Sequence, residues 1–149
     1  MPVASRCPPK SSFVESLRLT PIKVWFDGGS YGNGYQFQGY GSYEVDGGVK
    51  LHHKSTRQDF GSPITNNEAE YLSLLAALRW LQAQIVPERV GLEIWGDSQL
   101  VVQQVNRCWR VRKEHLKPLR DEARDLLRPY LWWELKWYPR KWNVNRFGH

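Results

Sequence analysis

The sequence predicts an α/β domain: a mixed five-stranded sheet with helices on its faces, in the order β-β-β-α-β-α-α-β. Three features lead to this expectation. The first part of the chain alternates apolar and polar residues on both sides of a glycine-containing hairpin signal, which is typical of an antiparallel meander. A capping box then opens a segment with apolar residues at helical spacing. The second half alternates short apolar runs with helical periodicity, as parallel strands joined by crossover helices require.

The first strand is expected to end at Asp27, because the residues before it alternate between core positions and a second face. The glycines that follow favour a flexible turn over residues 28–34. Asp46-Gly47-Gly48 is a strong hairpin signal, so two further strands should flank it. The three strands of this meander are expected over residues 22–27, 38–46 and 48–57.

The first helix is expected to begin at Thr65-Asn66-Asn67-Glu68, which matches the S/T-x-x-E capping box. A short apolar run then delivers Asp97 at the end of a strand, and Ser98 opens a second helix through about Asn106. Pro129 stops a third helix, and a basic tail follows the last strand. The remaining expected elements are strands over residues 90–95 and 131–138 and a helix over residues 116–127.

The chain has 149 residues, enough for one domain with a conventional core. Residues 1–20 have weak periodicity and are expected to form a flexible N-terminal leader to a catalytic domain over 21–149. No apolar run approaches the roughly 20 residues of a membrane helix, and no secretory h-region is present, so no membrane association is expected. Cys7 and Cys108 match no zinc-ligand spacing; free thiols and a reducing, cytoplasmic location are expected.

Positive charge is concentrated near the C-terminus. The formal net charge is +6, and residues 107–149 hold 12 of the 21 lysines and arginines with only five acids. Aromatic residues are interleaved with these cations, and this combination suits base stacking together with phosphate contact. A polyanion such as nucleic acid is therefore the expected partner. A solvated helix face is the alternative interpretation of the same charges.

Three acidic residues in separate motifs form the most informative pattern. Asp27 and Asp97 each end an expected strand, and Glu70 falls in the second turn of the first expected helix. Carboxylates that converge from distant segments repel one another unless a cation lies between them. Mg²⁺ held by a few carboxylates and a phosphate substrate is the commonest arrangement of this kind.

These motifs resemble those of the type 1 ribonuclease H family. The resemblance is carried by Asp27-Gly28-Gly29-Ser30, by the TNNEAEY segment from Thr65 and by the GDSQLVV segment from Gly96, in that order, and it covers about residues 22–149. It implies the ribonuclease H-like fold and hydrolysis of the RNA strand of RNA·DNA hybrids without sequence specificity. It also implies two divalent ions, Mg²⁺ or Mn²⁺, and products with 5′-phosphate and 3′-hydroxyl ends.

The resemblance also implies roles for individual residues. Asp27 would bridge both metal ions, Glu70 would bind one of them, and Asp97 would bind the ion that carries the attacking water. Substrate contacts are expected from the glycine turn and the helix start, although the two asparagines could instead serve only to cap the helix. The expected substrate contacts are Gly28, Gly29, Asn33, Thr65, Asn66 and Asn67.

The sequence departs from the family pattern in two places, and at each we expect other residues to take over the role. The basic helix that many members use as a substrate handle is absent, and Trp109 and Arg110 are expected to replace its contacts. The family's C-terminal motif, Pro-Arg-x-x-Asn-x-x-Ala-Asp, supplies a fourth acidic ligand. An ungapped alignment puts Phe147 at that position, whereas aligning from Asn145 puts His149 there. His149 is the expected fourth ligand; its α-carboxylate, Asn143, Asn145 or no role for His149 are the alternatives.

An endonuclease acting on RNA·DNA hybrids is thus the function that the sequence favours. A hybrid-binding module with weakened catalysis is the alternative from another class, and a related integrase or resolvase nuclease fits the TNNEAEY segment less well. No obligatory protein partner is evident, and a monomer is expected.

Overall fold

The structure, a computed structural model, describes residues 20–32 and 37–148 and contains one mixed sheet. The strand order is β3-β2-β1-β5-β6, and β4 also pairs with β2. Strand β1 is antiparallel to β2 and parallel to β5, which is parallel to β6. The α/β class and the mixed sheet are therefore confirmed. The strands are β1 (Ile22–Tyr31), β2 (Gln38–Asp46), β3 (His52–Lys54), β4 (Gln58–Gly61), β5 (Gly91–Gly96) and β6 (Trp132–Trp137).

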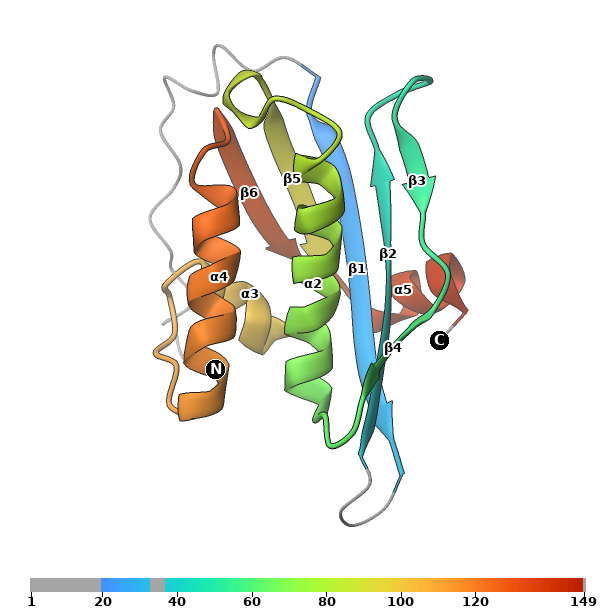
Figure 1. Ribbon diagram of the computed structural model, residues 1–149, viewed down its shortest axis with the longest axis vertical. Helices are drawn as coiled ribbons and strands as arrows, with labels where there is room; N and C mark the ends of the chain where they lie inside the picture. The colour runs from blue at the N-terminus through green and yellow to red at the C-terminus, as the bar shows by residue number, and fades with distance from the viewer. Residues whose placement is uncertain (1–19, 33–36, 149) are drawn as a thin grey trace.

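Helices cover both faces of the sheet unequally. In Figure 1, α2, α3 and α4 lie on one face, and α5 lies on the other, behind β1 and β2. The main core lies between the sheet and the first group of helices, where Val24, Leu74 and Ile94 are fully buried. The helices are α2 (Asn66–Gln82), α3 (Gln99–Val105), α4 (Lys117–Leu127) and α5 (Arg140–Phe147), with short 3₁₀ turns η2 (Pro87–Arg89) and η3 (Glu114–Leu116).

The meander differs from the sequence expectation in two places. Strand β1 does not end at Asp27 but continues through the glycines to Tyr31, because β2 pairs with it as far as Gln38. The single strand expected over 48–57 is instead two short strands, β3 and β4. Strand β3 pairs with residues 44–46 of β2, and β4 pairs with residues 39–41. The register of the β4 pairing shifts between Gly39 and Tyr40, as at a β-bulge.

The capping box predicted for α2 is confirmed. Thr65 is the N-cap: its side chain accepts from the backbone N–H of Glu68, and the Glu68 carboxylate accepts from the N–H of Thr65 at 3.0 Å. This reciprocal pair satisfies two N–H groups that would otherwise lack partners. Ser98 similarly caps α3, accepting from the N–H of Val101 at 3.2 Å. Both helices that start near the acidic motifs therefore have fixed first turns.

Helix α5 replaces the expected basic tail. Its sequence offers no apolar stripe, and Asn143 is its only buried residue. The helix is held by polar and cation–π contacts: the Arg146 guanidinium ion-pairs with Glu44 at 2.6 Å and stacks 3.8 Å from the ring centroid of Trp25. The helix ends at Gly148, whose φ of 77° is a left-handed conformation that glycine adopts readily.

Three further expectations concern the chain as a whole. The leader expected over residues 1–20 lies almost entirely outside the described residues. Cys108 is disulfide-bonded, so the expectation of a free thiol is wrong for this residue, and Cys7 lies outside the described residues. Among the residues that the structure describes, no helix is both long and apolar enough to cross a membrane.

Candidate active site

Three carboxylates from three elements meet where β5 ends, beside the middle of β1. Asp27 of β1, Glu70 of α2 and Asp97, just after β5, each offer one oxygen, and these oxygens lie within 4.8 Å of one another. Asp27 and Glu70 are only 6% and 7% exposed. The convergence expected from the sequence is therefore present, in a partly dehydrated environment.

The chain reaches this arrangement through strand register and one close approach. Strands β1 and β5 are parallel neighbours with Phe26 opposite Gly96, so the residues that follow, Asp27 and Asp97, emerge side by side. Strand β1 also passes very close to α2, because a Cβ at Gly28 would lie 2.3 Å from the carbonyl oxygen of Ala69. Only glycine permits this contact, and it brings Glu70 beside Asp27.

Side chains of neighbouring elements form hydrogen bonds with the backbone beside Asp27 and Asp97. The hydroxyl of Ser73 in α2 lies 2.9 Å from the carbonyl oxygen of Asp27, within donating distance. On the other face, the Asn143 amide donates to the carbonyl oxygen of Phe26 at 3.1 Å. The indole N–H of Trp137 donates to the carbonyl oxygen of Asp97 at 3.0 Å. Each acid-bearing segment is thus tied to a neighbouring element.

Ionisation of Asp27 and Glu70 is unfavourable in this arrangement, because both are buried and lie beside other acids. Burial, reinforced by the negative charge of Asp97, raises the pKa of Asp27 from 3.8 to about 7, against the opposing effect of the Arg140 guanidinium. Burial and the charges of Asp97 and Asp27 likewise raise the pKa of Glu70 well above its usual value. A cation that binds these acids must displace the protons that burial favours, so its affinity should rise with pH.

The donor set fits a hard divalent cation. One carboxylate oxygen of Glu70, Oε2, is buried and has no hydrogen-bond partner, although buried polar atoms are almost always paired. Oxygen ligands from several carboxylates suit Mg²⁺ or Mn²⁺. Within residues 20–32 and 37–148, this triad is the one group of acids, histidines or cysteines arranged in this way.

Two of the acids, Glu70 and Asp97, line a cleft of about 340 Å³. Four predicted substrate residues line it: Gly28 and Gly29 on the side of β1, and Asn66 and Asn67 at the start of α2. The Asn66 side-chain oxygen accepts from the backbone N–H of Ser30 at 2.7 Å, which leaves its amide nitrogen as the donor that can face a ligand. Thr65 caps α2, and Asn33 lies outside the described residues.

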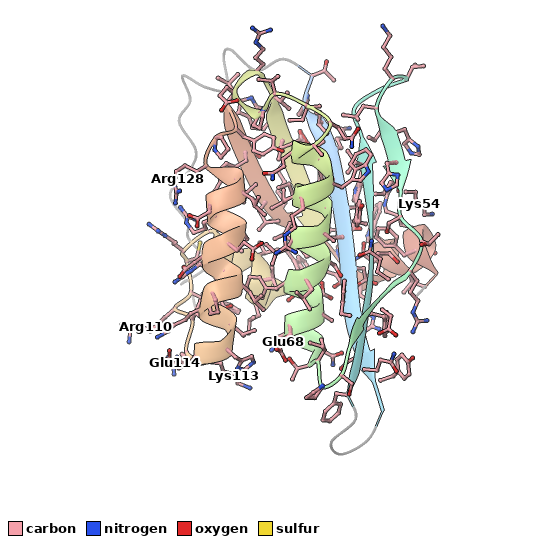
Figure 2. All side chains as sticks on the ribbon, in the orientation of Figure 1. Lys54, Glu68, Arg110, Lys113, Glu114 and Arg128 are labelled. Atoms are coloured by element: carbon pink, nitrogen blue, oxygen red, sulfur yellow. The ribbon has the colours of Figure 1, made fainter. Side chains whose placement is uncertain are left out.

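Trp109 and Arg110 do not join this cleft. They line a second cavity of about 500 Å³ that lies between α3 and η3, together with Arg112 and Lys113. Figure 2 shows Arg110 and Lys113 projecting at the same end of the molecule as Glu68, in the first turn of α2. A long ligand could therefore reach both cavities from one end of the protein.

Two candidates for the fourth ligand, Asn143 and Asn145, lie in helix α5. The buried asparagine of α5 is Asn143, which donates to Phe26 and accepts from the Tyr138 hydroxyl, whereas Asn145 is exposed. These two bonds give Asn143 a structural role. His149 lies outside the described residues, so its role as a ligand stays a prediction.

Four residues that line the cleft were not among the predicted site residues: Ser30, Tyr40, Ser98 and Arg140. The two serines adjoin the acidic motifs, whereas Tyr40 of β2 and Arg140, the first residue of α5, come from elsewhere in the chain. The sequence signal for Arg140 was its place in the Pro-Arg dipeptide of the C-terminal motif. Nothing local marked Tyr40, because its position depends on the pairing of β2 with the glycines of β1.

The sheet order, together with acids within β1, just after β5 and near the start of α2, defines a ribonuclease H-like protein. The chain belongs to the Reverse transcriptase-like family, whose model matches residues 48–145. Glu70 and Asp97 fall within the matched part, and Asp27 precedes it.

Relatives and solved structures agree with this assignment and confirm the resemblance to type 1 ribonucleases H. Ribonuclease HI of Halobacterium salinarum is 34% identical over 134 residues, which is 89% of this chain and 64% of that protein. The chain thus spans less than two thirds of that relative's length. A crystal structure of RNase H1 from the same archaeon has a TM-score of 0.71 at 27% identity, covering 86% of this chain and 94% of the other.

A third comparison concerns the fold alone. The crystal structure of LC11-RNase H1 in complex with an RNA/DNA hybrid has a TM-score of 0.69 at 24% sequence identity, covering 83% of this chain and 89% of the other.

The raised pKa of Asp27 makes a testable prediction for the metal-free protein. Between about pH 4 and pH 7 the folded protein retains a proton on Asp27 that the unfolded chain has lost, so this group lowers stability as the pH rises through that range. Asp27→Asn removes the effect. The free energy of unfolding of the variant, relative to wild type, should therefore increase from pH 4 to pH 7 by on the order of a few kcal/mol.

Denaturant titrations in EDTA at several pH values measure this difference. Asp125→Asn, which alters an exposed acid of α4, is the matched control and should show no comparable trend. A stability difference between Asp27→Asn and wild type that stays constant with pH would contradict the assignment.

Proposed function

We propose that this protein is an endonuclease that hydrolyses the RNA strand of RNA·DNA hybrids. The observation that carries the proposal is the triad of Asp27, Glu70 and Asp97, whose oxygens converge within 4.8 Å beside an open cleft. A protein that only bound nucleic acid would gain nothing from clustered carboxylates next to phosphate groups. The family and the relatives named Ribonuclease HI support the same reaction.

The triad would hold two divalent ions, Mg²⁺ or Mn²⁺. Such ions supply an activated water and stabilise the leaving 3′ oxygen during in-line displacement, which leaves 5′-phosphate and 3′-hydroxyl ends. The protein's part is to place the three carboxylates, and the bound ions would displace the protons that burial favours there. Burial of Asp27 and Glu70 limits water around the reacting phosphate, which strengthens each charge interaction there.

The cleft residues account for recognition without sequence specificity. Glycines at 28 and 29 allow a sugar–phosphate backbone to approach β1, and the amides of Asn66 and Asn67 offer hydrogen bonds beside it. RNA differs from DNA by its 2′-hydroxyl, and a close approach with a few polar groups is what discrimination requires. The solved complex of LC11-RNase H1 supports the proposal at the level of the fold, which can hold a hybrid.

The proposal is tested with labelled RNA·DNA hybrid, duplex RNA and duplex DNA, each incubated with Mg²⁺ or Mn²⁺. The hybrid alone should be cleaved, in its RNA strand. Asp27→Asn should reduce the rate by at least about a hundredfold, because loss of a direct ligand exceeds the 10–100-fold effects of outer-shell partners. Hybrid binding without any cleavage by the wild-type protein would overturn the catalytic assignment.

We also propose His149 as the fourth metal ligand. Its imidazole nitrogen suits Mn²⁺ better than Mg²⁺. His149→Asp should therefore increase activity with Mg²⁺ relative to Mn²⁺, and His149→Ala should weaken metal binding, as measured by calorimetry. Unaltered metal affinity and activity in His149→Ala would remove this residue from the site. His115→Ala, which removes an exposed histidine from η3, is the matched control for metal affinity.

Trp109 and Arg110 are proposed to bind the hybrid's backbone in place of a basic handle. Replacing Arg110, Arg112 and Lys113 with glutamine should make the logarithmic salt dependence of hybrid binding shallower, by about 0.9 for each phosphate that the protein no longer neutralises. Arg128→Gln is the control, because Figure 2 places this arginine at the opposite end of α4. An unchanged slope in the triple variant would exclude phosphate binding by this loop.

A further inference from the structure

An aromatic and basic surface lies beside the acid cleft on the β1–β2 hairpin. Tyr31 and Tyr40 are in contact, with ring centroids 5.8 Å apart. The guanidinium of Arg57, in the segment before β4, lies 3.9 Å from the ring centroid of Tyr40 and 5.5 Å from that of Tyr31. These three residues are called the hairpin platform. In Figure 1 the paired ends of β1 and β2 extend past the N-terminal end of α2.

The hairpin platform is continuous with the active site. Tyr40 lines the cleft that contains Glu70 and Asp97. Its hydroxyl lies over Gly29, where an added Cβ would be 2.6 Å from the hydroxyl oxygen. Gly29 is two residues beyond Asp27, a separation of about 7 Å along a strand. A nucleic-acid strand with a phosphate at the acids would therefore pass Tyr40 within about one nucleotide.

The outer members of the hairpin platform are open to solvent. Tyr31 is 52% exposed, and it lines a further cavity of about 430 Å³ with Gly32, Gln38 and Ser62. Arg57 is also exposed, and none of the carboxylates in the described part of the chain pairs with it. An exposed ring and an unpaired cation therefore lie together at the edge of an acid site.

The stacking of Arg57 suits it to bind phosphate. A guanidinium that lies flat on an aromatic ring uses its face for that contact, and its N–H groups then point outward from the edge in a fixed plane. Such a fork matches two oxygens of a phosphate group. The neighbouring ring of Tyr31 offers a surface on which a base can stack, whatever its identity.

We propose that the hairpin platform binds a nucleotide next to the cleaved phosphate, on the same strand that occupies the acid cleft. Tyr31 stacks on its base, Arg57 binds its phosphate, and Tyr40 keeps the guanidinium in place. The inference rests on the proposed function and extends it by adding a strand-binding site outside the residues that the sequence motifs mark. It also agrees with cleavage without sequence specificity, since neither contact reads the edge of a base.

The test measures binding of a labelled RNA·DNA hybrid in EDTA, over a range of KCl concentrations, for the full chain and its variants. Arg57→Gln should make the logarithmic salt dependence shallower by about 0.9, the value for one phosphate contact. Tyr31→Ala should weaken binding about tenfold, and Tyr31→Phe should restore it, because the stacking surface is retained. Arg89→Gln, in η2, removes an equal charge elsewhere and should leave both quantities unchanged.

A purely structural role for the hairpin platform gives a different result. In that case Arg57→Gln and Tyr31→Ala would lower the melting temperature while the salt dependence and the affinity stay at wild-type values, and this would overturn the proposal. Failure of the proposed function is separately visible, because the wild-type protein would then leave the hybrid uncleaved with Mg²⁺ or Mn²⁺, whatever the variants do to binding in EDTA.

Discussion

The mutual repulsion of three clustered carboxylates, two of them buried, is the constraint on which this site depends. Asp27, Glu70 and Asp97 lie within reach of one cation, and burial raises the pKa of the first two. Such a cluster persists only because the surrounding structure holds the segments that carry it. The contact between Gly28 and α2 forces the acids together, and the hydrogen bonds from Ser73 and Asn143 prevent β1 from moving away.

Helix α5 contributes to this constraint from the opposite face of the sheet. Its single buried residue, Asn143, uses both ends of its amide, one on β1 and the other on the Tyr138 hydroxyl. The cation–π contact of α5 with Trp25 extends across a stacked pair, Trp25 and Trp95, whose centroids are 5.6 Å apart on neighbouring strands. Two of the eight tryptophans, Trp25 and Trp95, thus pack across the strands that lead to Asp27 and Asp97.

Much of the site followed from the sequence because its parts are marked locally. The capping box at Thr65 fixes where α2 begins, and therefore where Glu70 lies relative to the first turn. The short apolar run before Asp97 likewise predicts a strand from the sequence alone, and β5 ends at Gly96. Once the order of elements is known, the register of parallel neighbours brings Asp27 and Asp97 together.

Other features could not be predicted, because they depend on contacts between distant segments. Glycines 28 and 29 suggested a turn, but pairing with β2 keeps them in the strand. Helix α5 has no apolar periodicity, since polar bonds rather than a hydrophobic face hold it to the sheet. The place of Tyr40 at the cleft and the stacking of Arg57 on it arise from tertiary structure alone.

The central claim is that the three carboxylates form a binding site for divalent ions. Anomalous X-ray diffraction from crystals grown with Mn²⁺ tests it most directly, because the metal is located without reference to activity. We expect manganese within bonding distance of Asp27, Glu70 and Asp97. An ordered triad without manganese, or manganese bound only elsewhere on the protein, would contradict the claim.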